Sequence, residues 1–192
     1  MSKKVLFSVI AAVLVVAAGA WYFTSQSHKN DSSSKMSSSM SMSSSMKMSS
    51  GMKMKTNGTL PTGLAQAQDP KYKVGQDITL EATHMAGMKG AKGTVAAVYD
   101  AKLYEVDFKS TDGMEVKNHK WLTKVDFKDG MDHKAGDKVT IESDHMSGMK
   151  GAKGTVVKVV DGPAYAVNFQ PTNGGKEVTN HLYLAEDEIE AR

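Results

Sequence analysis

The feature that most constrains the fold of this chain is an internal duplication. Residues 84–95 read HMAGMKGAKGTV, and residues 145–156 read HMSGMKGAKGTV. The correspondence continues downstream, where an Asn-His pair precedes Trp121 in the first copy and Tyr183 in the second. Such self-similarity indicates one small domain present twice. We place the two copies at residues 71–128 and 132–190.

Each copy has the sequence pattern of β-strands. In the first copy, apolar and polar residues alternate at 78–80, 94–98, 104–108 and 116–122, which is the period of a half-buried strand. Gly and Asp-Gly turns separate these stretches, and none of them has a helical period. The sequence therefore predicts an all-β protein made of two small SH3-like barrels in tandem.

The N-terminal residues, 1–24, predict an export signal or a membrane anchor. Lys3 and Lys4 precede an apolar run over residues 5–23, which is long enough to span a bilayer. We expect an uncleaved hydrophobic helix that leaves the rest of the chain on the extracellular face of the cell membrane. Cleavage after Ala20, which would release a secreted protein, is the alternative.

Residues 25–70 predict a disordered stalk, because Ser, Met, Lys and Gly offer too little bulky apolar surface to offset the ordering entropy. Half of the 14 methionines in the chain lie in this stalk. A core cannot form there, so these thioethers are candidates for binding a soft ion such as Cu(I). Low-complexity composition without a metal role is the alternative. The candidate ligands form three Met-x-Met pairs: Met40, Met42, Met46, Met48, Met52 and Met54.

A second set of candidate metal ligands lies in the two copies. Each copy brings an imidazole and two thioethers together in a Gly-rich stretch, and a further histidine recurs before the aromatic residue. Imidazole and thioether together suit copper, with Cu(I) favoured. Alternatively, one methionine of the motif belongs to the core, the histidine caps a turn through its ring nitrogen, and the glycines serve the backbone geometry. The residues are His84, Met85, Met88, His119, His145, Met146, Met149 and His181.

Composition argues against several other functions. The chain has no cysteine, which removes disulfides, thiolate metal sites and a lipid anchor on cysteine. The net charge is +3 without a clustered basic patch, so we expect no nucleic-acid partner. No catalytic constellation stands out, and we expect no enzyme activity.

The duplicated His-Met-x-Gly-Met-Lys-Gly-Ala-x-Gly-Thr-Val motif, followed by Asn-His-Lys-Trp-Leu, resembles the YdhK family of Gram-positive surface proteins. The resemblance covers roughly residues 71–190. It implies an exported protein with two such domains, and some members are similar to copper-tolerance lipoproteins that bind copper outside the cell. This chain departs from the lipoproteins because it lacks the lipidated cysteine.

Together these observations predict a surface-tethered extracellular protein that binds copper and sequesters Cu(I). The alternative is a module that binds cell-wall or other anionic polymer and has no metal role. Its candidate contacts are the lysines of the Gly-rich loops: Lys89, Lys92, Lys150 and Lys153.

Overall fold

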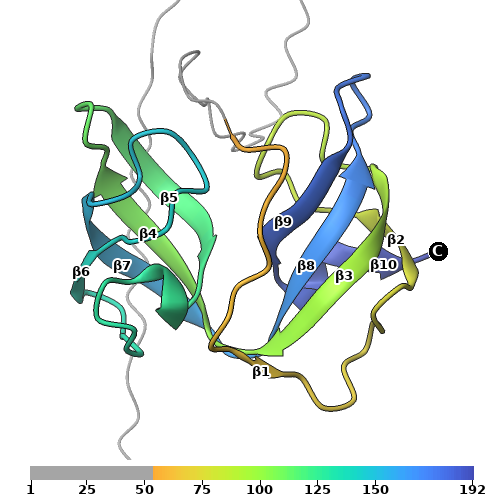
Figure 1. Ribbon diagram of the computed structural model, residues 1–192, viewed down its shortest axis with the longest axis horizontal. Coiled ribbons are helices and arrows are strands. Elements are labelled where there is room, and N and C mark those ends of the chain that lie inside the picture. The colour runs from red at the N-terminus through yellow and green to blue at the C-terminus, as the bar shows by residue number, and fades with distance from the viewer. Residues whose placement is uncertain (1–53) are drawn as a thin grey trace, which may run out of the picture. The chain divides into compact units, whose positions relative to one another are not determined.

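The computed structural model describes residues 54–192, and the N-terminal segment 1–24 and the stalk up to residue 53 lie outside that range. The described residues form ten β-strands and two short 3-10 helices (Figure 1). The all-β prediction is confirmed. None of the helices in this part of the chain is long and apolar enough to cross a membrane.

The strands form two antiparallel sheets. The first sheet has the order β10-β2-β3-β8-β9, with β1 paired to the outer part of β3. Its strands are β1 (Ala65–Gln66), β2 (Asp77–Leu80), β3 (Lys92–Asp100), β8 (Pro163–Gln170), β9 (Val178–Leu184) and β10 (Ile189–Ala191). The second sheet has the order β5-β4-β7-β6. It comprises β4 (Leu103–Lys109), β5 (Glu115–Leu122), β6 (Lys138–Thr140) and β7 (Lys153–Val160).

The two copies exchange strands. β3 and β4 are consecutive in the first copy, yet β3 pairs with β8 and β4 pairs with β7 of the second copy. The short connections at 101–102 and 161–162 carry the chain from one sheet to the other. Each sheet therefore combines the first half of one copy with the second half of the other. The prediction of one barrel per copy needs correction, because the strand pairing of the described residues gives two open sheets, each shared by both copies.

Three apolar clusters hold this arrangement together. One cluster lies against each sheet, and we call each sheet with its cluster a sheet unit. The third joins the two units, and includes Tyr99 of β3, Leu103 of β4, Trp121 of β5 and Tyr183 of β9. Burying one such large side chain stabilises the fold by about 1.5–3 kcal/mol. The contact between the sheets is thus part of the core.

A strap, which we define as residues 54–62, runs between the two sheets (orange in Figure 1). The sequence predicts disorder up to residue 70, whereas the structure places residues 54–70 against the sheets. The reason is backbone hydrogen bonding, which composition does not reveal. The Gly58 N–H donates to the Thr179 carbonyl at 2.8 Å. A Cβ at Gly58 would lie 2.2 Å from the Asn180 carbonyl oxygen, so only glycine fits there.

Candidate functional site

Four histidines, two from each copy, come together between the sheets. His119 lies on β5 and His181 on β9, and both are buried. His84 and His145 lie at equivalent places in the loops after β2 and β6. The ring centroids of His84 and His181 are 6.3 Å apart. His119 and His181 both lie within electrostatic range of His84 and His145.

The strand exchange decides which histidines are neighbours. Sequence order groups His84 with His119, because both belong to the first copy. In the structure His84 shares the first sheet unit with His181, whose ring lies edge-to-face on Phe169. His119 lies in the same way on Phe108 in the second unit. The grouping by copy is therefore corrected to a grouping by sheet.

A carboxylate contacts one histidine in each half. His84 Nε2 lies 2.8 Å from Glu188 Oε1, and His145 Nε2 lies 3.2 Å from Asp126 Oδ1. Glu188 ends the 3-10 helix η2 (Glu186–Glu188), and Asp126 ends η1 (Lys124–Asp126). The sequence reasoning missed both acids. The signal was present, because an acidic residue follows Trp121 and Tyr183 by five positions in each copy.

Each carboxylate is itself held in place. The second oxygen of Glu188 accepts hydrogen bonds from Trp121 Nε1 at 2.7 Å and from the Ala185 N–H at 3.1 Å. The second oxygen of Asp126 accepts from the Thr123 N–H at 2.8 Å. Burial by itself would raise the pKa of Glu188, but the contact with His84 and the hydrogen bond from Trp121 outweigh it and lower that pKa. Glu188 is therefore ionised at neutral pH.

Three ring nitrogens of the cluster are buried without a hydrogen-bond partner among the described residues: His84 Nδ1, His145 Nδ1 and His181 Nε2. A buried polar atom left unpaired costs about 1–3 kcal/mol. When Nε2–H donates to a carboxylate, the neutral ring keeps its lone pair on Nδ1. Carboxylate–histidine pairs of this kind orient metal ligands in many proteins. The orphaned nitrogens thus have the chemistry of ligands.

The two inner histidines are neutral at physiological pH. Burial is the main reason that the pKa of His119 and of His181 falls to about 3. A neutral imidazole is the form that binds a metal ion, so protons do not compete at these two rings near pH 7.

The methionines of the repeated motif lie elsewhere. Met88 and Met149 are completely buried, Met146 nearly so, and all three belong to the sheet cores. Met85 is partly buried against the first core. This placement gives them the gap-filling role typical of methionine. Met54 belongs to the strap, and the remaining candidate ligands lie outside the described residues: Met40, Met42, Met46, Met48 and Met52.

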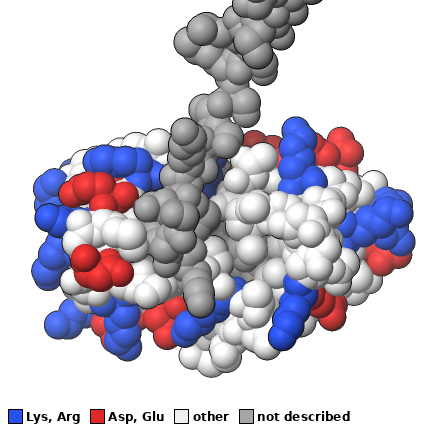
Figure 2. Space-filling view, turned by 90° about the horizontal axis from the view of Figure 1, so that it is seen from above, with Lys and Arg blue, Asp and Glu red and all other residues white. Residues whose placement is uncertain are grey.

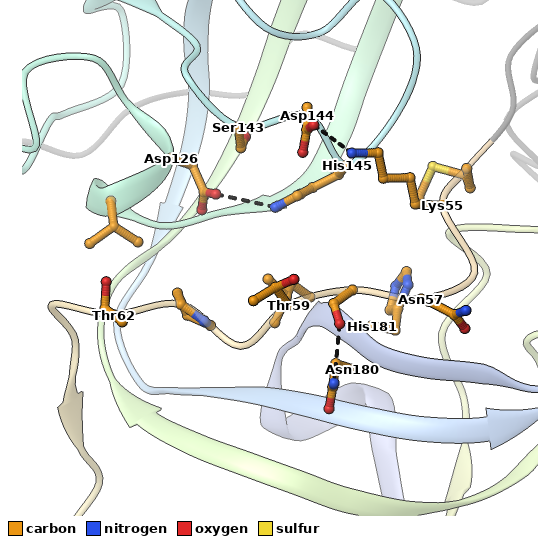
Figure 3. Close-up of a pocket in the computed structure, with 15 residues that line it drawn as sticks. Lys55, Asn57, Thr59, Thr62, Asp126, Ser143, Asp144, His145, Asn180 and His181 are labelled. Carbon is orange, nitrogen blue, oxygen red and sulfur yellow. Dashed lines mark hydrogen bonds and ion pairs between the residues drawn. The ribbon is translucent and has the colours of Figure 1, made fainter.

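A cavity of about 320 Å³ adjoins one side of the cluster (Figure 3). The strap forms one wall, and Asp126, Asp144, His145 and His181 contribute to the others. Within residues 54–192, no group of three or more His, Cys, Asp or Glu side chains is placed so that it could hold a metal ion.

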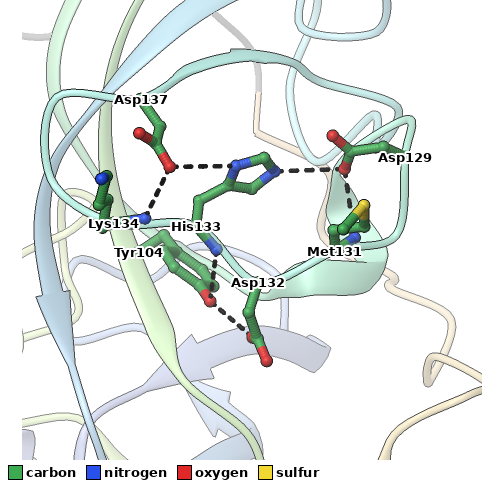
Figure 4. A network of polar contacts seen from close by, with 7 residues as sticks. All are labelled: Tyr104, Asp129, Met131, Asp132, His133, Lys134 and Asp137. Carbon is green, nitrogen blue, oxygen red and sulfur yellow. Dashed lines mark hydrogen bonds and ion pairs between the residues drawn. The ribbon is translucent and has the colours of Figure 1, made fainter.

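His133 lies apart from the cluster, at the start of the second copy before β6 (Figure 4). Its Nε2 is 3.2 Å from Asp129 Oδ1 and its Nδ1 is 3.6 Å from Asp137 Oδ2, so both nitrogens have partners. The ring packs edge-to-face on Phe127. His133 occupies the position that Tyr72 has in the first copy, and its contacts are those of a packing residue.

Comparison with known proteins identifies relatives over the duplicated region. The family model described as "Protein of unknown function (DUF1541)" matches twice, at residues 74–124 and 135–186. The chain is 39% identical over 136 residues to the uncharacterized protein YdhK of Bacillus subtilis (strain 168), a match that covers 69% of this chain and 66% of that protein.

Solved structures of YdhK from Bacillus subtilis agree with the fold. A crystal structure is 38% identical, with a TM-score of 0.68, and covers 70% of this chain and 94% of that one. The solution structure of the YdhK C-terminal domain has a TM-score of 0.60 at 38% identity and covers 62% and 93%, respectively. The two family matches confirm the duplication, and the chain belongs to the DUF1541 family, as its resemblance to YdhK predicts.

Proposed function

We propose that this chain is an extracellular, surface-tethered protein that binds and sequesters copper and has no catalytic activity. The observation that carries this proposal is the set of three buried, unpartnered ring nitrogens on His84, His145 and His181. In a folded protein such atoms call for a partner. A bound metal ion would supply such a partner.

The donor chemistry supports copper among the metals that imidazole accepts. Imidazole suits zinc, copper, iron and nickel, whereas thioethers suit Cu(I). Copper is the ion that both the histidine cluster and the Met-x-Met pairs of residues 40–54 accept. The neutral state of His119 and His181 and the carboxylates behind His84 and His145 add the features expected of ligating imidazoles.

Binding requires the histidine side chains to move together, because no group of three such side chains in residues 54–192 could hold an ion as placed. A metal–nitrogen bond of about 2.0–2.1 Å places the centroids of two rings on one ion up to about 6 Å apart. The His84 and His181 rings, at 6.3 Å, are close to that separation. Because the ligands do not yet form a complete set, the rings must turn by a rotamer adjustment when the ion enters.

Tethering follows from the apolar run at residues 5–23, with the Met-rich segment between anchor and domain. In this proposal the methionines trap Cu(I) near the membrane and the histidines hold it in the domain.

Binding of anionic wall polymer has less support. Two of its candidate lysines already have acidic partners, since Lys89 pairs with Glu81 at 3.6 Å and Lys150 with Glu142 at 2.8 Å. On the face seen in Figure 2, basic and acidic side chains alternate. A polymer-binding surface would instead collect basic groups on one face.

Copper titration of the full-length chain in mild detergent tests the proposal. Replacing His84 and His145 together by Asn should weaken Cu(I) and Cu(II) binding to the domain at least about tenfold, because each substitution removes the one ring nitrogen that is free to bind a metal. The matched control is His133→Asn, which removes a partly buried histidine outside the cluster and should leave copper binding unchanged. Equal affinity in both variants and the parent chain would refute the histidine site. Salt-sensitive binding of wall polymer without copper binding would favour the alternative.

A further inference from the structure

We infer that Met54 passes Cu(I) from the Met-x-Met run to His145 and His181, and that the strap covers this histidine pair until the ion arrives. This inference rests on the proposed copper function. It assigns an entry route and a loading residue to the histidine cluster.

The strap is bonded directly to the residues that carry the two histidines. The Lys55 N–H donates to the His145 carbonyl at 3.1 Å. Farther along, the Thr179 N–H donates to the Thr56 carbonyl at 2.8 Å, and Asn180 Nδ2 donates to the Gly58 carbonyl at 3.1 Å. Thr179 and Asn180 immediately precede His181. The strap thus spans the opening between the two histidines.

The strap has little buried surface. None of its nine residues is buried, and most are exposed. The ion pair between Lys55 and Asp144, at 2.5 Å, joins side chains that are 54% and 64% exposed, and such pairs contribute little to stability. Segments with few buried contacts open far more readily than the core. Displacing the strap would therefore leave the sheets intact.

Met54 stands where the methionine run meets the cavity. It is the second member of the pair Met52-x-Met54, and it lines the same cavity as His145 and His181. Its backbone bridges to Met146, and its side chain packs against the second sheet core. A thioether needs no deprotonation to bind Cu(I), so an ion on Met54 is already at the wall of the histidine cavity.

Charge favours movement of a cation in this direction. Asp126 and Asp144 both line the cavity (Figure 3). When the strap lifts, the Lys55 ammonium leaves Asp144, which removes a positive charge from the entrance and frees a carboxylate. Opening and attraction of the ion are thereby coupled.

Transfer kinetics in the full-length chain test this inference. Cu(I) is supplied from a coloured chelator, and the colour change after rapid mixing follows the loss of Cu(I) from the chelator. Copper K-edge X-ray absorption of frozen samples follows the change from sulfur to nitrogen ligands. Met54→Leu keeps the apolar volume but removes the thioether, and Met131→Leu is the matched control because Met131 is exposed in the linker. We expect Met54→Leu to slow transfer to nitrogen ligands about tenfold with unchanged final occupancy, and Met131→Leu to behave as the parent chain.

Gly58→Ala tests the strap itself. The added Cβ would clash with the Asn180 carbonyl, so the strap should be displaced and uptake should become faster, with Thr59→Ala as the control. Unchanged transfer in Met54→Leu overturns the role of Met54, and unchanged or slower uptake in Gly58→Ala overturns the role of the strap. Both results would leave the copper function standing if the His84/His145 double variant still loses binding. Copper uptake that does not depend on these histidines overturns both proposals.

Discussion

His119 and His181 show most clearly how position changes the chemistry of a residue. Free imidazole has a pKa near 6.5, but burial moves the pKa of both rings to about 3. The sequence identified both residues by their repetition before an aromatic residue. It gave no indication of burial, because the alternation along residues 116–122 does not say which face of the strand meets a second sheet.

The shifted pKa of His181 predicts that the apo protein loses stability in mild acid. Below pH 6.5 the unfolded chain takes up a proton at this ring, while the folded chain does not until about pH 3, so the free energy of unfolding falls as the pH drops through that window. In His181→Asn, the fall in the free energy of unfolding between pH 7 and pH 5 should be smaller than in the parent chain by about 1 kcal/mol or more. Urea denaturation at several pH values measures this free energy. The same pH dependence in the variant and the parent chain would contradict the lowered pKa of His181.

At the scale of elements, the strands were predictable and their partners were not. The alternating stretches at 94–98 and 104–108 lie within β3 and β4. However, β4 and β8 share the same pattern of aromatic and aliphatic residues, so the sequence alone gives no basis for choosing between them as the partner of β3. The same limit applied to the site. All four histidines were named from the sequence, but their grouping depended on the exchange, and Asp126 and Glu188 were missed because they lie in polar stretches.

Gly93 permits the close approach of the paired strands β3 and β8, and its substitution should destabilise the fold. A Cβ there would lie 2.2 Å from the Asn168 carbonyl oxygen and 2.9 Å from Phe169 Cβ. We expect Gly93→Ala to lower the free energy of unfolding by about 1–3 kcal/mol, the usual cost of overpacking. Gly175→Ala, at an exposed turn, is the control and should change it by less than about 0.5 kcal/mol. Thermal unfolding of the two variants measures this, and equal stability would show that the strands can separate locally.

At the scale of the whole molecule, duplication and strand exchange make one folding unit out of two sequence copies. Neither copy contains a complete sheet. β2 of the first copy pairs with β10 at the end of the second, and β3 pairs with β8 along most of its length. The third apolar cluster then joins the two units through Trp121 and Tyr183. The four histidines lie where these contributions meet.

The exchange predicts that a single copy does not fold as a monomer. Residues 54–128 alone lack β8, which pairs with β3, and β7, which pairs with β4. Analytical ultracentrifugation and circular dichroism should therefore show an unfolded chain or a dimer that exchanges strands between molecules. Mixing this fragment with residues 129–192 should restore the fold of the 54–192 chain, which serves as the control. A stable monomer with native strand content from one copy would contradict the observed pairing.

The pairing of distant residues also sets an order of events during synthesis. His84 contacts Glu188, which lies 104 positions later in the chain. When only the first copy has left the ribosome, His84 and His119 are present, but neither of the two sheets that bury the histidine cluster is complete. The cluster of four histidines therefore cannot form until both copies have emerged from the ribosome. If the chain is exported, the cluster would therefore form only on the far side of the membrane.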